Sequence, residues 1–223
     1  MRDEKAAFEQ AREVLKELEN TLRENEITNC ARAVTAYELA HTALSEGRPS
    51  DAVEILLAAI EPNDPAGQYN WGSDYFNGLK VPMDYKKACW WFTKAHEQGY
   101  ADATTALGYM YQEGLFVSKD YEKAYALYLE AANKGNAQAQ RSLGVLLING
   151  DGVERNPLLA LEWMTKAAEA ADLQAMRFLG QMLIEEDDIP KDVEKGYEWL
   201  RRAAEKGDEE SVQILKDREI TKI

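Results

Sequence analysis

Cysteine, histidine and proline are scarce in this chain, which has two, two and six of them in 223 residues. Cys30 and Cys89 stand alone, without the paired spacing of a zinc site, and we expect them to be small reduced core residues. His41 and His96 have no acidic, Ser or Cys partner at a catalytic spacing. A metal site would need ligands that the sequence does not offer. We therefore predict no enzymatic activity, no cofactor and no metal; a hydrolase is the least favoured alternative.

The sequence contains no long apolar run, and we expect no secretory leader. The longest fully apolar run covers residues 55–60, which is far too short to cross a bilayer. The first five residues open a charged stretch that lacks the apolar region of a signal peptide. We expect a cytoplasmic protein with no membrane segment.

Acidic residues outnumber basic ones, and the formal net charge is −14. Such a charge favours solubility, argues against non-specific binding to nucleic acid or to an anionic membrane, and mildly favours a basic partner. The simpler alternative is an acidic surface that is only solvated.

A period of 36 residues organises most of the chain. Shifting the sequence by this period aligns a Leu-Gly pair, or Trp-Gly in the first copy, at Trp71-Gly72, Leu107-Gly108, Leu143-Gly144 and Leu179-Gly180. The same shift aligns an alanine near the end of each copy: Ala95, Ala131, Ala167 and Ala203. Four copies without an insertion indicate a repeat array in which each unit contacts its neighbours.

Each 36-residue unit is predicted to be a pair of helices, A and B. The B helices begin after a residue that can cap them, namely Asp84, Asp120, Asn156 or Asp192. Glycine follows the B helices at the position that favours a left-handed backbone (Gly99, Gly135 and Gly207), but the third unit has Ala171 there. Gly108, Gly144 and Gly180 lie inside A helices, where we expect a missing side chain to let helix B approach closely.

The two ends of the chain differ from the central repeats. Residues 2–26 predict a charged amphipathic helix, which is either a packing helix or one half of a coiled-coil dimer, with an apolar stripe at Phe8, Ala11, Leu15, Leu18 and Leu22. Residues 31–65 predict a helical hairpin of tetratricopeptide type, and residues from 209 onward a capping helix. The predicted organisation is therefore 1–65, 66–208 and 209–223, in one continuous solenoid.

The repeat resembles the Sel-1-like repeats, which are relatives of tetratricopeptide repeats. The resemblance rests on the pattern Ala-x3-Leu-Gly-x2-Tyr-x2-Gly followed by Val, Asp and Lys-Ala, which the second unit carries as Ala103, Leu107, Gly108, Tyr111, Gly114, Val117, Asp120 and Lys123-Ala124. It implies an all-α fold, a right-handed α-solenoid of stacked helix pairs. Members of the family hold other proteins together, and some bacterial members are immunity proteins that neutralise a toxin.

Two functions follow from this resemblance. The first is a non-enzymatic adaptor that binds a peptide or protein partner on its concave face. The alternative is a cytoplasmic immunity protein whose acidic surface covers the basic site of a toxin. In either case we expect no nucleic acid and no membrane as a partner, and a monomer or weak dimer.

In tetratricopeptide arrays the A helices line the concave face, and residues three or four apart project together. The Leu-Gly register places three rows there, one residue per unit: Tyr69, Thr105, Arg141, Arg177; Ser73, Tyr109, Val145, Gln181; and Phe76, Gln112, Ile148, Ile184. The partner-binding residues predicted from these rows are Tyr69, Phe76, Thr105, Tyr109, Gln112, Arg141, Ile148, Arg177, Gln181 and Ile184. The alternative for Phe76, Ile148 and Ile184 is burial between neighbouring units.

Arg141 and Arg177 occupy one column of adjacent units, so their guanidinium groups are expected side by side. Nothing in the repeat pattern requires both charges, and the prediction is that they bind a partner carboxylate. Tyr109 and Phe76 would then hold an apolar side chain of the partner. The opposing hypothesis is that acidic residues of an adjacent helix already neutralise the two arginines.

Overall fold

The computed structural model describes residues 39–49, 51–52, 64–78 and 82–220. The helix predicted over residues 2–26 and most of the hairpin predicted over 31–65 lie outside the described residues. The chain divides into two compact units, Met1–Ala88 and Cys89–Ile223, and each is described by itself. All regular structure in the described ranges is helical.

The first unit contains α4 (Pro65–Asn77) and the beginning of α5 (Tyr85–Glu97). Asp64 caps α4 by accepting a hydrogen bond from the backbone N–H of Gly67 at 2.7 Å, and Gly78 ends the helix with a left-handed backbone, φ 66°. The ring of Phe76 packs at 5.4 Å, centroid to centroid, against the ring of Tyr85.

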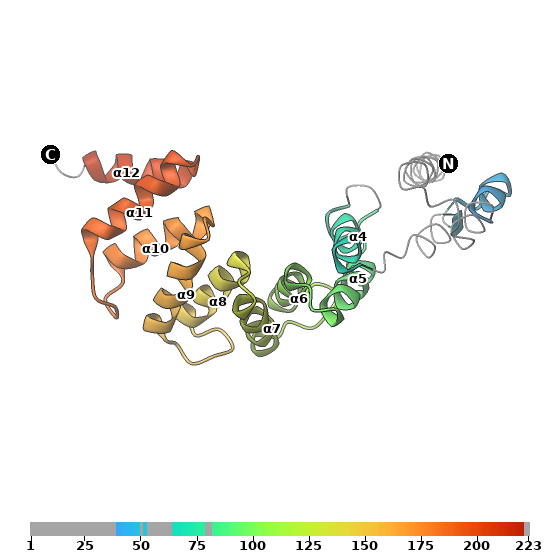
Figure 1. Ribbon diagram of the computed structural model, residues 1–223, viewed down its shortest axis with the longest axis horizontal. Coiled ribbons are helices and arrows are strands. Elements are labelled where there is room, and N and C mark those ends of the chain that lie inside the picture. The colour runs from blue at the N-terminus through green and yellow to red at the C-terminus, as the bar shows by residue number, and fades with distance from the viewer. Residues whose placement is uncertain (1–38, 50, 53–63, 79–81, 221–223) are drawn as a thin grey trace. The chain divides into compact units, whose positions relative to one another are not determined.

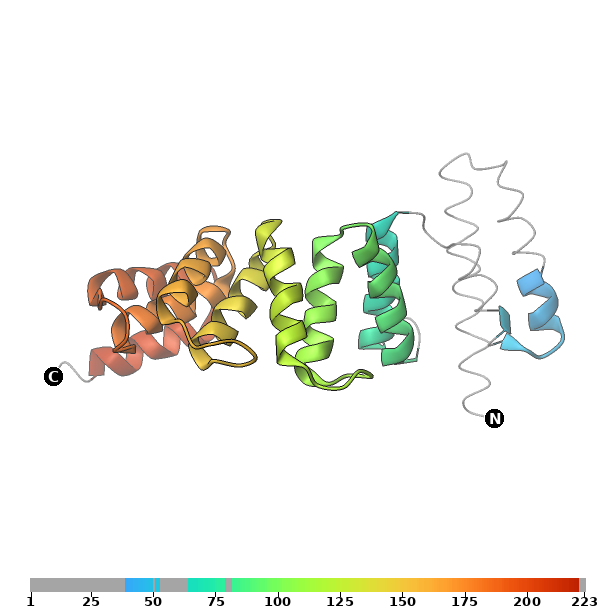
Figure 2. The ribbon, with the colours of Figure 1, turned by 90° about the horizontal axis from the view of Figure 1, so that it is seen from below.

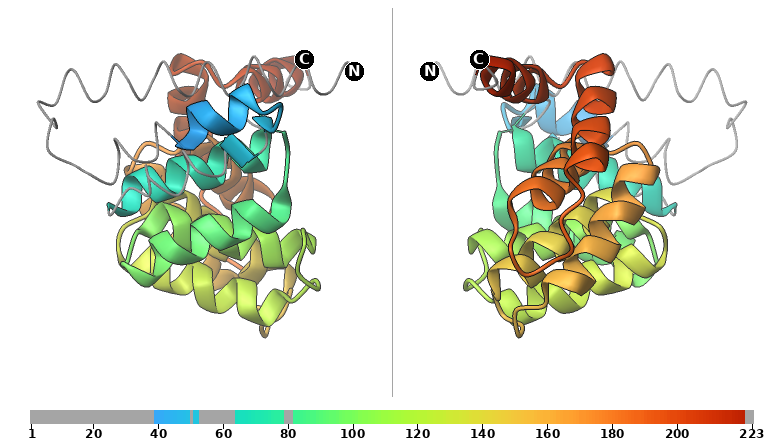
Figure 3. Two further views of the ribbon diagram at one scale, coloured as in Figure 1. Left: turned by 90° about the vertical axis from the view of Figure 1, so that its right-hand side faces the viewer. Right: turned by 90° about the vertical axis from the view of Figure 1, so that its left-hand side faces the viewer.

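The second unit is a row of helices, each packed against the next along the chain (Figures 1 and 2). After the end of α5 it contains α6 (Ala101–Glu113), α7 (Tyr121–Asn133), α8 (Ala137–Asn149), α9 (Pro157–Glu169), α10 (Leu173–Glu185), α11 (Val193–Glu205) and α12 (Glu209–Ile220). Helix α12 ends the row and faces the viewer in the right panel of Figure 3. Helix pairs packed in succession make this an all-α solenoid, as the period of the sequence predicts.

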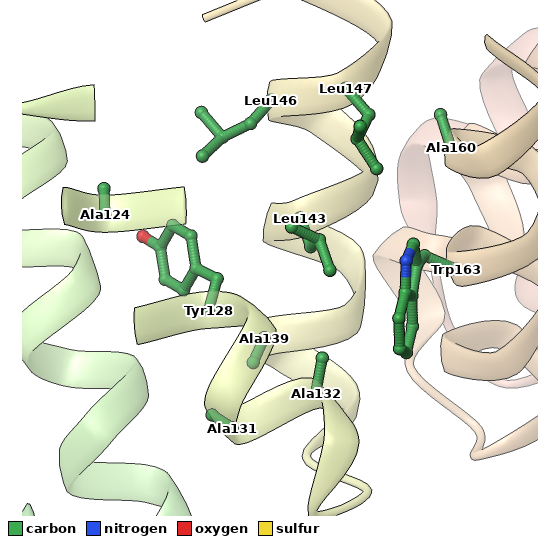
Figure 4. Packing of buried hydrophobic residues seen from close by; sticks show 10 residues of the cluster. All are labelled: Ala124, Tyr128, Ala131, Ala132, Ala139, Leu143, Leu146, Leu147, Ala160 and Trp163. Atoms are coloured by element: carbon green, nitrogen blue, oxygen red, sulfur yellow. The ribbon is translucent and has the colours of Figure 1, made fainter. Parts of the chain in front are cut away.

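The core runs continuously through the row because the A helices α8 and α10 each pack against two B helices, α7 and α9 for α8, and α9 and α11 for α10. In Figure 4, Leu146 of α8 lies beside Tyr128 of α7, whereas Leu147 points towards Ala160 and Trp163 of α9. All five residues are buried, and Trp163 is the most exposed of them at 8%. The leucine and alanine columns of the repeat are therefore core positions.

The glycines inside the A helices mark close contacts, as expected. A Cβ atom on Gly108 would lie 2.7 Å from the ring of Tyr128, and one on Gly144 would lie 2.9 Å from the Met164 side chain. On Gly180 the Cβ would lie 2.8 Å from the backbone carbonyl oxygen of Gly196. These distances are shorter than any packed side chain allows, so the glycines set the spacing of each helix pair.

The predicted B-helix caps are confirmed, since each of the four side chains accepts a hydrogen bond from the backbone N–H three residues later. The structure also shows a second set of caps, which begin A helices: Asp64, Asn136, Asp172 and Asp208. The side chain of Tyr100, which holds this position before α6, makes no capping hydrogen bond.

Ala171 occupies the left-handed position after its B helix, with φ 67° where Gly135 has φ 87°. The side chain of an L-residue is strained in this region, so we expect Ala171→Gly to stabilise the protein by about 1 kcal/mol. Gly135→Ala is the matched control, because no atom lies within 4 Å of the added Cβ and only the backbone changes. Urea unfolding should show opposite shifts in midpoint. An Ala171→Gly protein that unfolds at lower urea than wild type would contradict the assignment of strain.

Candidate partner-binding face

The inner face is the solvent-exposed side of α6, α8 and α10, the helices on the inner side of the curved row in the second unit (Figure 1). On each helix it consists of a stripe of residues three or four apart that are exposed or half-buried. Its members are Asp102, Ala106, Tyr109 and Glu113 on α6, Gln138, Ser142, Val145 and Asn149 on α8, and Gln174, Phe178, Gln181 and Glu185 on α10.

Two of the ten predicted residues, Tyr109 and Gln181, lie on the inner face. Tyr109 is 41% exposed and is the largest exposed apolar side chain of α6, α8 and α10. Tyr69 and Phe76 belong to the first unit, where both are half-buried. The assignment of all ten residues to a partner stays a prediction, and the structure establishes where the side chains lie.

The other predicted residues lie at the edges of the inner face or beneath it. Thr105 is 2% exposed, and its hydroxyl donates to the carbonyl oxygen of Ala101 at 2.9 Å. The amide oxygen of Gln112 accepts a hydrogen bond from the hydroxyl of Tyr128 at 3.0 Å. Ile148 packs on the core, and Ile184 reaches the backbone of Gly196. The expectation that Thr105 projects from the face is therefore wrong. The two isoleucines are half-buried against neighbouring helices.

The expectation that nothing in the fold requires the two arginines is also wrong. The Nε of Arg141 lies 3.1 Å from a carboxylate oxygen of Asp172, and a terminal nitrogen of Arg177 lies 2.9 Å from Asp208 and 3.1 Å from Glu210. Arg177 is only 8% exposed. The opposing hypothesis is the one that the structure supports, because each arginine neutralises the acidic cap of the next A helix.

These carboxylates have two roles at once. Asp172 accepts both the backbone N–H of Ala175, which caps α10, and the guanidinium of Arg141 from α8. Asp208 does the same for α12 with Ser211 and Arg177. Each arginine therefore connects an A helix to the start of the next one. In the preceding unit a hydrogen bond takes the place of the ion pair. The side-chain amide of Asn136, the cap of α8, donates to a carboxylate oxygen of Asp102 on α6 at 2.6 Å.

The inner face of α8 and α10 carries no unpaired charge among the described residues. The two helices contain only three charged residues, Arg141, Arg177 and Glu185, and Glu185 is paired with Arg218 of α12. By contrast, α11 alone contains six charged residues, all of them exposed; one of the six, Arg202, stacks over the ring of Trp199 at 4.8 Å. Charge is thus concentrated on the B helices and loops.

The acidic loop of the fourth unit is also paired with basic groups. Arg155 donates to Glu186 at 2.8 Å and to Asp188, while Lys191 pairs with Asp187. The hydrogen bond and the charge of Lys191 hold the pKa of Asp187 below its usual value. A large part of the formal negative charge here is therefore balanced locally.

The residues that could carry chemistry are engaged in packing. His96 Nδ1 lies 2.9 Å from the hydroxyl of Thr104, which is fully buried and donates to the carbonyl oxygen of Tyr100 at 3.1 Å. Burial raises the pKa of the Cys89 thiol, so the reactive thiolate is disfavoured. In the described ranges, no three His, Cys, Asp or Glu side chains are grouped so as to hold a metal ion, and no helix could span a bilayer.

The inner-face residues that the sequence rows missed include three amides (Gln138, Asn149 and Gln174), three acidic residues (Asp102, Glu113 and Glu185) and Phe178. A signal for them was present in the phase of the buried positions: Ala139, Leu143, Leu146 and Leu147 define the packed side of α8. The opposite side must then carry residues 138, 142, 145 and 149, which include Gln138 and Asn149. The rows taken from the Leu-Gly register were offset from this stripe in two cases: the first and third rows each lie one residue before the exposed position.

Helix pairs that recur every 36 residues, cap to cap, define an α-solenoid repeat protein. The model of the Sel1 repeat matches the sequence four times, at residues 65–100, 101–136, 137–172 and 173–208. The chain therefore belongs to the Sel1 repeat family, as its sequence pattern predicts.

Two solved structures show the same fold. A Sel1 repeat protein from Oxalobacter formigenes is 31% identical with a TM-score of 0.64, over 83% of this chain and 74% of that one. The c5321 protein of uropathogenic Escherichia coli, described as a protective antigen with an SLR fold, is 29% identical with a TM-score of 0.66. The match covers 88% of this chain but only 42% of the E. coli protein. Among curated proteins, no match was found.

Proposed function

We propose that this chain is a non-enzymatic interaction scaffold whose inner face binds a protein partner. Sel1 repeat proteins are generally scaffolds for protein–protein interaction, which gives the class of function. The observation that supports the inner face is its composition: Tyr109 is exposed there, Val145 and Phe178 are half-buried, and the charged groups of α8 and α10 are paired within the chain.

Aromatic and apolar groups surrounded by uncharged polar ones are typical of the centre of a protein interface. The outer side, formed by B helices, is less suited to this role because exposed charges interrupt it. Leu158 of α9, for example, is 55% exposed but is followed by exposed Glu162 and Lys166 on the same helix. An interface here would remove the hydration of both charges, and no ion pair within the described chain would compensate for that loss.

The test compares two single substitutions of similar kind on opposite sides of the row. We expect Tyr109→Ala to weaken capture of the physiological partner about 30-fold, because a central aromatic anchor contributes about 2 kcal/mol or more. Leu158→Ala is the matched control on α9 and should retain capture. Affinity purification with the wild-type chain identifies the partner, and titration of that purified partner measures all three dissociation constants.

Both variants should keep the helical signal and melting temperature of the wild type, because both side chains are exposed. If the Tyr109→Ala variant binds the partner with wild-type affinity and the Leu158→Ala variant does not bind it, the interface lies on the outer side. A partner bound equally by all three proteins would exclude the inner face around Tyr109.

A further inference from the structure

Three glutamine side chains of the inner face form no hydrogen bond within the described part of the chain. They are Gln138 at the start of α8, Gln174 at the equivalent position of α10, and Gln181 two turns further along α10. Gln138 and Gln174 are exposed, and Gln181 is half-buried. The neighbouring polar groups differ in this respect, since the amide of Asn149 donates to Asp151 at 3.1 Å.

A primary amide offers a donor and an acceptor side by side, which matches the N–H and C=O groups of a peptide backbone. Charged side chains lack this property, because an ammonium only donates and a carboxylate only accepts. Gln174 and Gln181 are seven residues apart, which corresponds to about 10 Å along a helix. An extended chain covers about 10 Å in three residues, so both amides could bind one strand.

Apolar surface lies between the amides. Phe178 stands between Gln174 and Gln181 on the same stripe of α10, and Val145 holds the position equivalent to Gln181 on α8. Both side chains are half-buried against the core and leave part of their surface to solvent. An apolar side chain of a bound strand would find contact here.

The charge of a bound segment is restricted by the same face. Arg141, Arg177 and Glu185 already form ion pairs within the chain. The two arginines pair with the acidic caps of the following A helices, and Glu185 pairs with Arg218. A basic or acidic segment lying on α8 and α10 would therefore lose hydration without gaining an opposite charge. The residues responsible for the net charge of −14 therefore lie mainly outside the inner face of α8 and α10.

We propose that the inner face of α8 and α10 binds an extended, uncharged segment of a partner protein through its backbone. The amides of Gln138, Gln174 and Gln181 hydrogen-bond the backbone, and Val145 and Phe178 contact one of its apolar side chains. This inference rests on the proposed function and specifies the chemistry of the partner for the same face.

The experiment uses the full chain and a phage library of random 12-residue peptides. Enriched peptides are synthesised, and their dissociation constants are measured for the wild type and for a variant with Gln138→Leu, Gln174→Leu and Gln181→Leu. Leucine has nearly the volume of glutamine but no hydrogen-bonding group. The matched control is Glu162→Leu with Glu198→Leu, two exposed positions on the B helices.

We expect enriched peptides without net charge in their shared motif, an affinity loss of tenfold or more in the triple variant, and no loss in the control. A second measurement identifies the backbone as the ligand. Methylation of a backbone nitrogen within the motif should weaken binding to the wild type severalfold but should have little further effect in the triple variant, where the amides are gone.

Four results would overturn the proposal. Motifs rich in Lys, Arg, Asp or Glu would show that charge is recognised, and equal affinity of the triple variant would show that the amides are not used. If no peptide is enriched while a partner sensitive to Tyr109→Ala is found, the strand is wrong and the scaffold function stands. If neither peptide nor such a partner is found, both proposals fail.

Discussion

Gly180→Ala should destabilise the protein by about 2–3 kcal/mol, although alanine is the better helix former by about 1 kcal/mol. The reason is that the new Cβ would lie 2.8 Å from both the backbone carbonyl oxygen of Gly196 and Cγ of Leu200. A Cβ on Gly196 would in turn meet the carbonyl oxygen of Gly180 at 2.8 Å. Here two helix backbones are in contact, and a backbone cannot move aside without shifting α10 from α11.

Gly144→Ala is the matched control, because it makes the same change in the preceding unit. Its Cβ would meet Met164 side-chain atoms at 2.9 and 3.0 Å, and an unbranched side chain can adopt another rotamer. We expect a change within about 1 kcal/mol of wild type, since the gain in helix propensity offsets the repacking. Urea unfolding followed by circular dichroism measures both. A Gly180→Ala protein as stable as Gly144→Ala would refute the backbone contact.

Arg177→Met should cost about 3 kcal/mol, because it removes one partner of a buried ion pair and leaves the other in place. The side chains of Arg177 and Asp208 are only 9% and 10% exposed. Methionine retains the packing of the aliphatic part of arginine, so the loss isolates the charge. Arg201→Met on α11 is the control, since Arg201 is exposed, and it should change the unfolding free energy by less than about 0.5 kcal/mol.

The same ion pair predicts how stability depends on pH. Burial alone would raise the pKa of Asp208, but two hydrogen bonds from Ser211 and the charge of Arg177 together hold it below its usual value. A lowered pKa in the folded state means that the contribution is complete above the unfolded value, near pH 4, and is lost as the pH falls through the folded value. Arg177→Met should therefore lose most stability at neutral pH and least in acid. A constant difference from pH 7 to pH 3 would contradict this assignment.

The sequence predicted the repeat, its helix pairs and the glycine contacts because these depend on local rules that recur every 36 residues. The caps at Asp120 and Asn156 follow from the residue types that accept a backbone N–H, and the structure shows both bonds. The close approach at Gly144 follows from a residue without a side chain in a helix interior. Such signals need no knowledge of how one unit is rotated on the next.

The binding face was harder to predict because it depends on that rotation. Arg141 and Arg177 were predicted to lie side by side on the concave face and to bind a partner carboxylate, but each reaches a carboxylate of this chain 31 residues further along the sequence. Both carboxylates belong to the second set of caps, which was not anticipated, so nothing in the sequence favoured the opposing hypothesis of neutralisation over partner binding. Thr105 occupies the same column without any such pair, which shows that one row of a repeat need not have one role.

The pairing of the charged groups also changes what the acidic composition means. The loop of the fourth unit looks like a free acidic surface in the sequence, yet Glu185, Glu186 and Asp188 each have an arginine partner. The exposed charges that remain lie mainly on the B helices. We therefore expect partner recognition at the inner face to depend on apolar contact and hydrogen bonds more than on net charge.

The central claim, that the inner face binds the partner, is tested most directly by photo-crosslinking in the intact cell. A photoreactive phenylalanine analogue is placed at position 109 of α6 or at position 158 of α9, two exposed apolar positions on opposite sides of the row. The account predicts a crosslinked partner at position 109 and none at position 158. Crosslinking of the same partner at position 158 alone would contradict it.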